Sequence, residues 1–210
     1  MEQHLLKTTR TARYFTLGNT AGVNDILIIL HGYGQLASTF IAEFTELQLP
    51  GRLIIAPEGL NRFYAKGLGG KPVATWMTSE ERENEIADYI EYLERLYSAM
   101  VPKLFKGRIR VLGFSQGVAT ASRWIHHSAF QFTDFVMCSG DIAFELRNPL
   151  SEKISNLHCS YITGNNDPLL TVENKVAVNE LMQKLNAQFY TFEGGHQLHI
   201  PTLKDLFINL

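Results

Sequence analysis

Apolar runs of strand length alternate with longer stretches of helical periodicity along this chain, and this alternation constrains its fold most strongly. A short, uninterrupted apolar run suits a strand that is covered on both faces, and a helix between two such strands supplies a parallel crossover. The sequence therefore predicts an α/β fold with a mostly parallel, twisted sheet and helices on both faces. The buried strands are expected at residues 25–30, 53–56, 108–112, 134–138, 160–163 and 188–192, with weaker opening strands at 5–9 and 13–17.

The expected helices have apolar residues three or four positions apart. The longest follows Thr78-Ser79-Glu80-Glu81, which has the form of a capping box, and its apolar positions continue from Ile86 to Met100. Further helices are expected at residues 39–47, 116–127, 172–185 and 199–206.

The intervals between the strands are short. No interval exceeds one helix with its loops, so we expect a single domain over residues 1–210 without a cap domain. The least regular interval is the glycine-rich segment 58–75, which the sequence predicts to be a loop. Irregular loops of this length in compact domains are usually functional or mobile.

Charge and hydropathy exclude several classes of function. Nineteen Lys and Arg residues against 21 Asp and Glu residues give a net charge of -2, without the basic block of a nucleic-acid-binding protein. The chain has no long uncharged apolar run, so integral membrane association is not expected. Residues 1–10 lack the apolar stretch of a secretory signal, so a cytoplasmic protein is expected. A small molecule is the expected partner, and the sequence leaves open whether the chain is a monomer or a homodimer.

The two cysteines, Cys138 and Cys159, fall near opposite ends of two neighbouring predicted strands. We therefore expect two buried thiols rather than a disulfide.

A candidate nucleophile lies in Gly113-Phe114-Ser115-Gln116-Gly117, which fits the pattern G-x-S-x-G. The pentapeptide follows a predicted strand and opens a predicted helix, and this context carries more weight than the pattern itself. A sharp strand-to-helix turn holds the serine in a strained conformation, while the flanking glycines let strand and helix approach closely. Ser115 is therefore expected to project above the edge of the sheet.

A serine hydroxyl needs a base, and the base needs a third group that orients it. In this architecture the expected order along the chain is serine, acid, histidine. Asp167 directly follows the strand predicted at 160–163, and His196 follows the last strand after two glycines. Both side chains are thus expected at the edge where Ser115 lies. A metal site is not expected, because His199 and His196 have no further ligands grouped near them.

Acyl transfer also needs donors for a developing oxyanion. The backbone amide of Gln116 lies at the start of the helix after Ser115. The amide of Tyr33, in His31-Gly32-Tyr33-Gly34 directly after the strand at 25–30, is the second expected donor, and His31 is expected to brace this loop rather than to react.

Together with Gly164-Asn165-Asn166-Asp167-Pro168-Leu169 and Gly194-Gly195-His196, these two motifs resemble the phospholipase/carboxylesterase family of α/β-hydrolases, which includes acyl-protein thioesterases and small bacterial carboxylesterases. The resemblance runs from about Asp25 to His199. It implies Ser115 as nucleophile, Asp167 as orienting acid and His196 as base, with the amides of Tyr33 and Gln116 as oxyanion donors. It also implies that Trp76 lines an acyl pocket and that no cofactor is needed.

Two features depart from the family pattern. Asp141 stands where the family commonly has an apolar or aromatic residue, so it is an alternative acid or a charge that repels anionic substrates. The segment 58–75 has no obvious counterpart in the thioesterases. Besides Trp76 and Asp141, the expected substrate-binding residues are Phe63, Tyr64 and Ile142.

The resulting expectation is a serine hydrolase that cleaves carboxylic esters of short to medium acyl chain through an acyl-serine intermediate. One alternative keeps the mechanism but acts on longer acyl chains, as a thioesterase or a lysophospholipase. Another is a hydrolase-like protein that binds a ligand without catalysis, since one fold hosts many functions.

Overall fold

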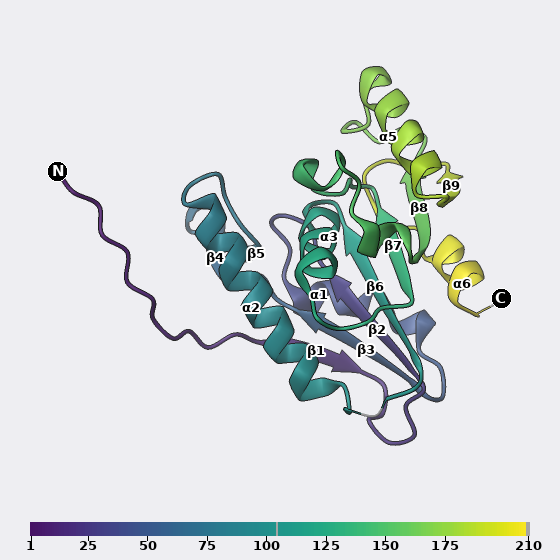
Figure 1. The fold of residues 1–210 in the computed structure, drawn as a ribbon, viewed down its shortest axis with the longest axis horizontal. Coiled ribbons are helices and arrows are strands. Elements are labelled where there is room, and N and C mark those ends of the chain that lie inside the picture. The colour runs from purple at the N-terminus through teal and green to yellow at the C-terminus, as the bar shows by residue number, and fades with distance from the viewer. Residues whose placement is uncertain (104, 209–210) are drawn as a thin grey trace.

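The computed structural model describes residues 1–103 and 105–208. Its main sheet has seven strands in the order β1-β3-β2-β6-β7-β8-β9, and only β1 runs antiparallel to its neighbour (Figure 1). The mostly parallel α/β architecture is thus confirmed. The strands are β1 (Tyr14–Leu17), β2 (Asp25–Leu30), β3 (Arg52–Pro57), β6 (Arg108–Phe114), β7 (Asp134–Cys138), β8 (His158–Gly164) and β9 (Gln188–Phe192).

Helices cover both faces of this sheet because the central strands are apolar on both sides. Alternate residues of β2 fall into two separate buried clusters, one containing Ile28 and the other Leu27. The first cluster packs under α2 (Arg82–Met100), α3 (Gln116–His127), α4 (Glu152–Ser155) and α5 (Val172–Lys184). The second packs under α1 (Ala37–Ala42), the 3-10 helix Thr45–Leu47 and α6 (Ile200–Ile208).

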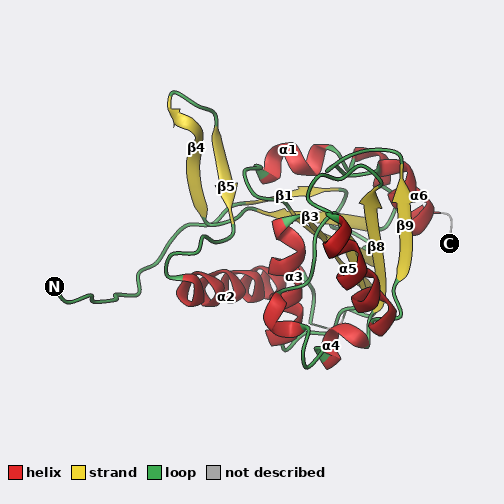
Figure 2. Ribbon diagram, turned by 90° about the horizontal axis from the view of Figure 1, so that it is seen from above, coloured by secondary structure: helices red, strands yellow, loops and turns green. Residues whose placement is uncertain are grey.

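The segment expected to be an irregular loop forms a second sheet instead. Strands β4 (Asn61–Leu68) and β5 (Pro72–Thr75) pair antiparallel as a hairpin that projects from the body of the protein (Figure 2). The turn is possible because Gly67 has a φ of +61° and its carbonyl accepts a hydrogen bond from Gly70 N at 3.1 Å.

Three other local predictions are wrong. Residues 5–9 form no strand: Leu5 and Leu6 lie exposed among charged neighbours and bury too little surface to fix a strand. In place of one helix at 39–47, the chain forms an α-helix that ends at Ala42 and a separate 3-10 helix at Thr45–Leu47. The capping box at Thr78 is absent, since α2 begins at Arg82 and the Thr78 amide donates to the carboxylate of Glu85.

Between β7 and β8 the chain forms only the 3-10 helix Phe144–Leu146 and α4, so no cap domain is inserted there. Cys138 and Cys159 are both buried and free, as expected, and burial raises the pKa of both thiols, that of Cys159 to about 12. Across the described residues, none of the helices has both the length and the apolarity that a membrane span requires.

Candidate active site

Ser115 sits in a strained turn between β6 and α3. Its φ of 53° and ψ of -120° lie outside the regions that residues with a side chain favour. A Cβ atom at Gly113 would lie 2.5 Å from the Gly117 carbonyl oxygen, and one at Gly117 would lie 2.2 Å from the Leu30 carbonyl oxygen. Both glycines of the motif are therefore needed for β6, α3 and β2 to approach one another.

Two further loops pack directly against this turn. A Cβ atom at Gly32, after β2, would lie 3.2 Å from the Cβ of Ser115, and one at Gly140, after β7, would lie 2.4 Å from the Ser115 carbonyl oxygen. The amide of Ser115 donates to the Cys138 carbonyl at 2.9 Å. The serine thus lies where the carboxyl ends of three neighbouring strands meet, the usual ligand edge of an open α/β sheet.

His196 and Asp167 are joined by a hydrogen bond, with Nδ1 of the imidazole 2.8 Å from Oδ2 of the carboxylate. The second carboxylate oxygen accepts a hydrogen bond from the Leu169 amide at 2.9 Å, and the Asp167 side chain is only 3 % exposed. A carboxylate can only accept from a neutral imidazole, so the proton lies on Nδ1 and Nε2 keeps its lone pair. The imidazole ring packs against Phe114, the neighbour of Ser115, at 5.1 Å between ring centroids.

The loop 31–34, which carries the Tyr33 amide, is fixed by the buried His31. The Gly59 amide donates to Nε2 of His31 at 2.9 Å, so the proton lies on Nδ1, which donates to the Gly32 carbonyl at 2.8 Å. Burial lowers the pKa of His31. The ring also stacks on Trp76 at 5.0 Å, and Trp76 Nε1 donates to the His31 carbonyl at 2.8 Å. His31 braces the loop, as the sequence predicts.

The side chain of Gln116 has a positioning contact that the sequence analysis missed. Its Oε1 accepts hydrogen bonds from Thr75 Oγ1 at 2.9 Å and from the Trp76 amide at 3.2 Å, while its Nε2 donates to the Met77 carbonyl at 2.9 Å. Gln116 is the first residue of α3, and the first amides of a helix have no intrahelical acceptor, so its backbone amide can donate to a ligand. Nothing in the sequence pattern around Ser115 indicates the side-chain contacts, which depend on how β5 approaches α3.

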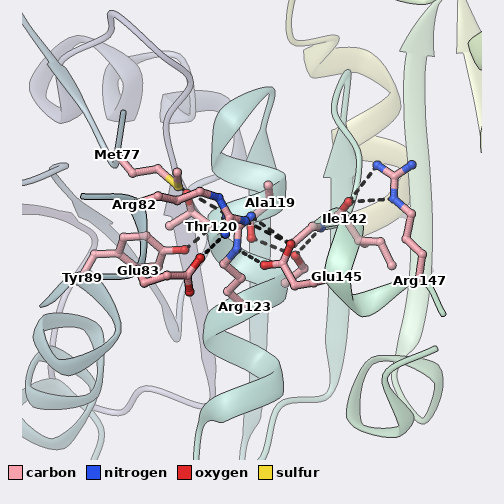
Figure 3. Close-up of polar contacts among 12 residues, drawn as sticks. Met77, Arg82, Glu83, Tyr89, Ala119, Thr120, Arg123, Ile142, Glu145 and Arg147 are labelled. Atoms are coloured by element: carbon pink, nitrogen blue, oxygen red, sulfur yellow. Dashed lines mark hydrogen bonds and ion pairs between the residues drawn. The ribbon is translucent and has the colours of Figure 1, made fainter. Parts of the chain in front are cut away.

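Asp141 lies after β7, but the structure joins it to Arg147 rather than to His196. Its Oδ2 lies 2.8 Å from Nη2 of Arg147. The same nitrogen also donates to the Ile142 carbonyl at 3.0 Å (Figure 3). Burial raises the pKa of Asp141, and Arg147 opposes that effect. Of the two candidate acids, only Asp167 contacts the imidazole.

The residues expected to line a substrate pocket differ in exposure. Trp76 and Ile142 are each 1 % exposed, so in this conformation neither side chain offers a wall to a substrate. Tyr64, at 52 %, and Tyr33, at 61 %, are exposed, and Phe63 is half-buried with its ring 5.3 Å from that of Tyr33. Loop 31–34 and the β4–β5 hairpin therefore each offer an exposed tyrosine.

A second network that the sequence did not predict supports α3 from the side (Figure 3). The buried Arg123 donates to both carboxylate oxygens of Glu145, at 2.5 and 3.4 Å, and to the hydroxyl of Tyr89 at 3.4 Å. Arg82, from α2, contacts the same carboxylate at 3.1 Å. Although burial opposes it, the hydrogen bond from Arg123 lowers the pKa of Glu145 to about 2. This network ties α2, α3 and the segment after β7 together.

No group of three or more His, Cys, Asp or Glu side chains that could hold a metal ion occurs within residues 1–103 and 105–208. His199, the nearest histidine to His196 in the sequence, stacks on Phe192 at 4.4 Å, and its Nδ1 lies 2.8 Å from Thr202 Oγ1.

Comparisons with known proteins agree with this architecture. The crystal structure of Zea mays acyl-protein thioesterase 2 is 18 % identical, with a TM-score of 0.71 over 94 % of this chain and 96 % of that one. Esterase PE8 is 18 % identical, with a TM-score of 0.67 over 94 % and 97 %. A phospholipase/carboxylesterase from Dyadobacter fermentans is 17 % identical, with a TM-score of 0.64 over 97 % and 99 %.

At these identities the structures show the shared fold, that of the α/β-hydrolases. Comparison with curated proteins gives no match. The family model described as Phospholipase/Carboxylesterase, however, matches residues 18–207, nearly the whole chain. The protein therefore belongs to the phospholipase/carboxylesterase family and is a hydrolase of the esterase and thioesterase kind.

Proposed function

We propose that the protein is a serine hydrolase that cleaves carboxylic esters of short to medium acyl chain through an acyl-Ser115 intermediate. The observation that carries this proposal is the 2.8 Å bond between His196 Nδ1 and Asp167 Oδ2, with the imidazole packed on the residue that precedes the strained serine. A buried carboxylate that fixes one tautomer leaves Nε2 ready to accept a proton.

The reaction would run in two halves. In the first, Nε2 of His196 takes the proton of Ser115 as Oγ attacks the ester carbonyl carbon, and the amides of Tyr33 and Gln116 donate to the oxyanion that forms. The tetrahedral intermediate then collapses, and the departing alcohol takes the proton from His196. In the second half Nε2 of His196 takes a proton from a water molecule as the water attacks the acyl carbon. The bond from that carbon to Ser115 Oγ then breaks, Oγ regains its proton from His196, and the free acid leaves.

The preferred acyl-chain length of the substrate is inferred from the burial of the residues expected to line its pocket. Trp76 and Ile142 are closed off, and the segment between β7 and β8 adds no cap, which supports a shallow site. The second candidate, a thioesterase or lysophospholipase on longer chains, is favoured by exposed apolar side chains on strand β4 and on the segments that follow β2, β7 and β8. These side chains are Tyr33, Tyr64, Phe144 at 81 % exposure and Leu169 at 63 %.

Rates on p-nitrophenyl esters of increasing chain length, measured beside acyl thioesters, separate the two candidates. We expect kcat/KM to peak at short or medium chains and Ser115→Ala to abolish turnover. A peak at long chains or a preference for thioesters would favour the second candidate. If a fluorophosphonate probe leaves the native protein as unlabelled as Ser115→Ala, a non-catalytic binding protein would be favoured instead.

A further inference from the structure

A cavity of about 750 Å³ lies at the opposite edge of the sheet from Ser115. The first residues of four consecutive strands line it: Arg108 of β6, Asp134 of β7, His158 of β8 and Gln188 of β9. Ser115, Asp167 and His196 follow the other ends of β6, β8 and β9, roughly 20 Å away at 3.3 Å per residue. We call this space the amino-edge cavity, and it is separate from the candidate active site.

Strand register places the polar residues of the amino-edge cavity on one face of the sheet. Arg110 is paired with Asp134 and Asp134 with His158, while Ser160 is paired with Gln188 in the next row. Helix α6 lies beside this face and contributes Leu206 and Phe207 to the lining (Figures 1 and 2). The cavity thus combines a row of polar side chains with an apolar wall.

Arg110 is the residue that gives the amino-edge cavity its chemistry. It is 6 % exposed, its guanidinium lies over the Phe207 ring at 5.2 Å, and its buried Nε makes no hydrogen bond with any residue that the structure describes. The nearest carboxylate oxygens, on Asp25 at 3.3 Å and Asp134 at 3.8 Å, are ion-pair partners without hydrogen-bond geometry. Oδ1 of Asp25 is likewise buried without a hydrogen-bond partner among the described residues. A buried guanidinium with unmade hydrogen bonds is costly unless another acceptor completes them.

Two arginines, Arg108 and Arg110, line the amino-edge cavity with one carboxylate, that of Asp134, so the lining carries an excess of positive charge. Arg52 donates to Asp25 Oδ2 at 2.6 Å and to the Leu47 and Phe207 carbonyls at 2.9 and 2.8 Å, so each of its three side-chain nitrogens has an acceptor. Asp25 is thus shared between Arg52 and Arg110, and Asp134 lies near Arg110, while Arg108 is exposed at the start of β6. Arginine suits oxyanions because its planar fork of donors matches carboxylate and phosphate groups.

We propose that the amino-edge cavity is a second binding site, for a small amphiphilic anion whose carboxylate or phosphate head contacts Arg108 and Arg110. Its apolar body packs on Phe207, Leu206 and Val136. The site does not depend on the proposed catalytic mechanism, because none of its residues belongs to the candidate active site.

Titration of the native protein with octanoate, octyl phosphate and inorganic phosphate, followed by backbone amide NMR, tests this proposal. We expect saturable shifts at the first residues of β6, β7, β8 and β9 with at least one octyl ligand, and at least tenfold weaker binding of inorganic phosphate. The better octyl ligand tells a carboxylate site from a phosphate site. Shifts confined to loops 31–34 and 194–196, no saturation, or equal binding of inorganic phosphate would overturn the proposal.

Charge variants test the role of the cations. Arg108→Glu and Gln188→Glu alter exposed side chains, so the fold should be kept and the octyl ligand should bind at least tenfold more weakly. Arg110→Met should also weaken binding of the octyl ligand at least tenfold. If Arg110→Met fails to fold, the result rests on Arg108→Glu and Gln188→Glu. Arg95→Gln, an exposed arginine on α2 that pairs with Glu91, is the matched control and should bind within twofold of the native protein. Unchanged affinity in both exposed variants would contradict the proposal.

Discussion

Oδ2 of Asp167 lies 2.8 Å from Nδ1 of His196, and Oδ1 of the same carboxylate accepts a hydrogen bond from the Leu169 amide. The carboxylate is held from both sides and is almost fully buried, so it fixes the imidazole in one orientation and one tautomer. Asp141 lies at the same edge of the sheet but is paired with Arg147. Substitution by asparagine should therefore lower kcat far more at Asp167 than at Asp141.

Asp167→Asn should lower kcat by about 10³- to 10⁴-fold, because an amide can donate to Nδ1 and favour the wrong tautomer. The comparison variant is Asp141→Asn, for which we expect less than a tenfold change in kcat. Both are measured on the best p-nitrophenyl ester, with circular dichroism to confirm the fold. A larger loss in Asp141→Asn than in Asp167→Asn would exchange the roles of the two residues.

Gln116→Ala keeps the backbone amide of residue 116 but removes the side-chain bonds to Thr75, Trp76 and Met77. We expect a loss of about 1–3 kcal/mol in the free energy of unfolding, because the amide of the buried Trp76 loses its acceptor, while Thr75 Oγ1 and the Met77 carbonyl keep their hydrogen bond to each other at 3.0 Å. Trp76 also holds the His31 carbonyl, so kcat should fall more than KM rises as loop 31–34 shifts. Urea unfolding and steady-state kinetics measure the two effects.

Gln116→Glu provides the matching control, since it keeps an oxygen for Thr75 and Trp76 but cannot donate to Met77. Its losses in the free energy of unfolding and in kcat should both be smaller than those of Gln116→Ala. If Gln116→Ala matches the native protein in stability and kcat, the side chain has no positioning role.

Much of the central sheet could be predicted from the sequence because its strands are buried on both faces and read as continuous apolar runs. The bounds of β2 and α3 agree residue for residue with the expected segments 25–30 and 116–127. The ends of parallel strands lie at one edge of the sheet, so the proximity of Asp167 and His196 also followed from chain order.

The β4–β5 hairpin could not be predicted in this way. It projects from the body of the protein, and its exposed residues lack the alternation that a half-buried strand imposes. The burial of Trp76 and Ile142 and the pairing of Asp141 with Arg147 depend on how distant segments pack, which no local pattern encodes.

The buried His31 makes stability depend on pH. Its pKa is lowered by burial, so below pH ~6.5 the unfolded chain binds a proton that the folded chain does not. Its contribution is therefore fully present above pH ~6.5 and is lost as the pH falls toward the lowered folded-state pKa, at up to about 1.4 kcal/mol per pH unit. Urea unfolding between pH 7.5 and 5 measures this slope.

In His31→Gln that component of the slope should disappear, although the variant is less stable at pH 7.5. His4→Gln, at an exposed histidine, should keep the native slope. An unchanged slope in His31→Gln would show that other groups dominate over this pH range.

Arg123 and Glu145 should contribute to stability as a pair, because Arg123 is buried and donates to both oxygens of the carboxylate. In a double-mutant cycle of Arg123→Met and Glu145→Gln, we expect a coupling free energy of about 1–2 kcal/mol at pH 7. The pKa of Glu145 is lowered to about 2, so its contribution is present above the unfolded value near ~4.3 and is lost as the pH falls toward about 2. Arg95→Met with Glu91→Gln, an exposed pair on α2, provides a reference that should couple by less than about 0.5 kcal/mol. Equal coupling in the two cycles would mean that the buried network adds nothing beyond an ordinary surface ion pair.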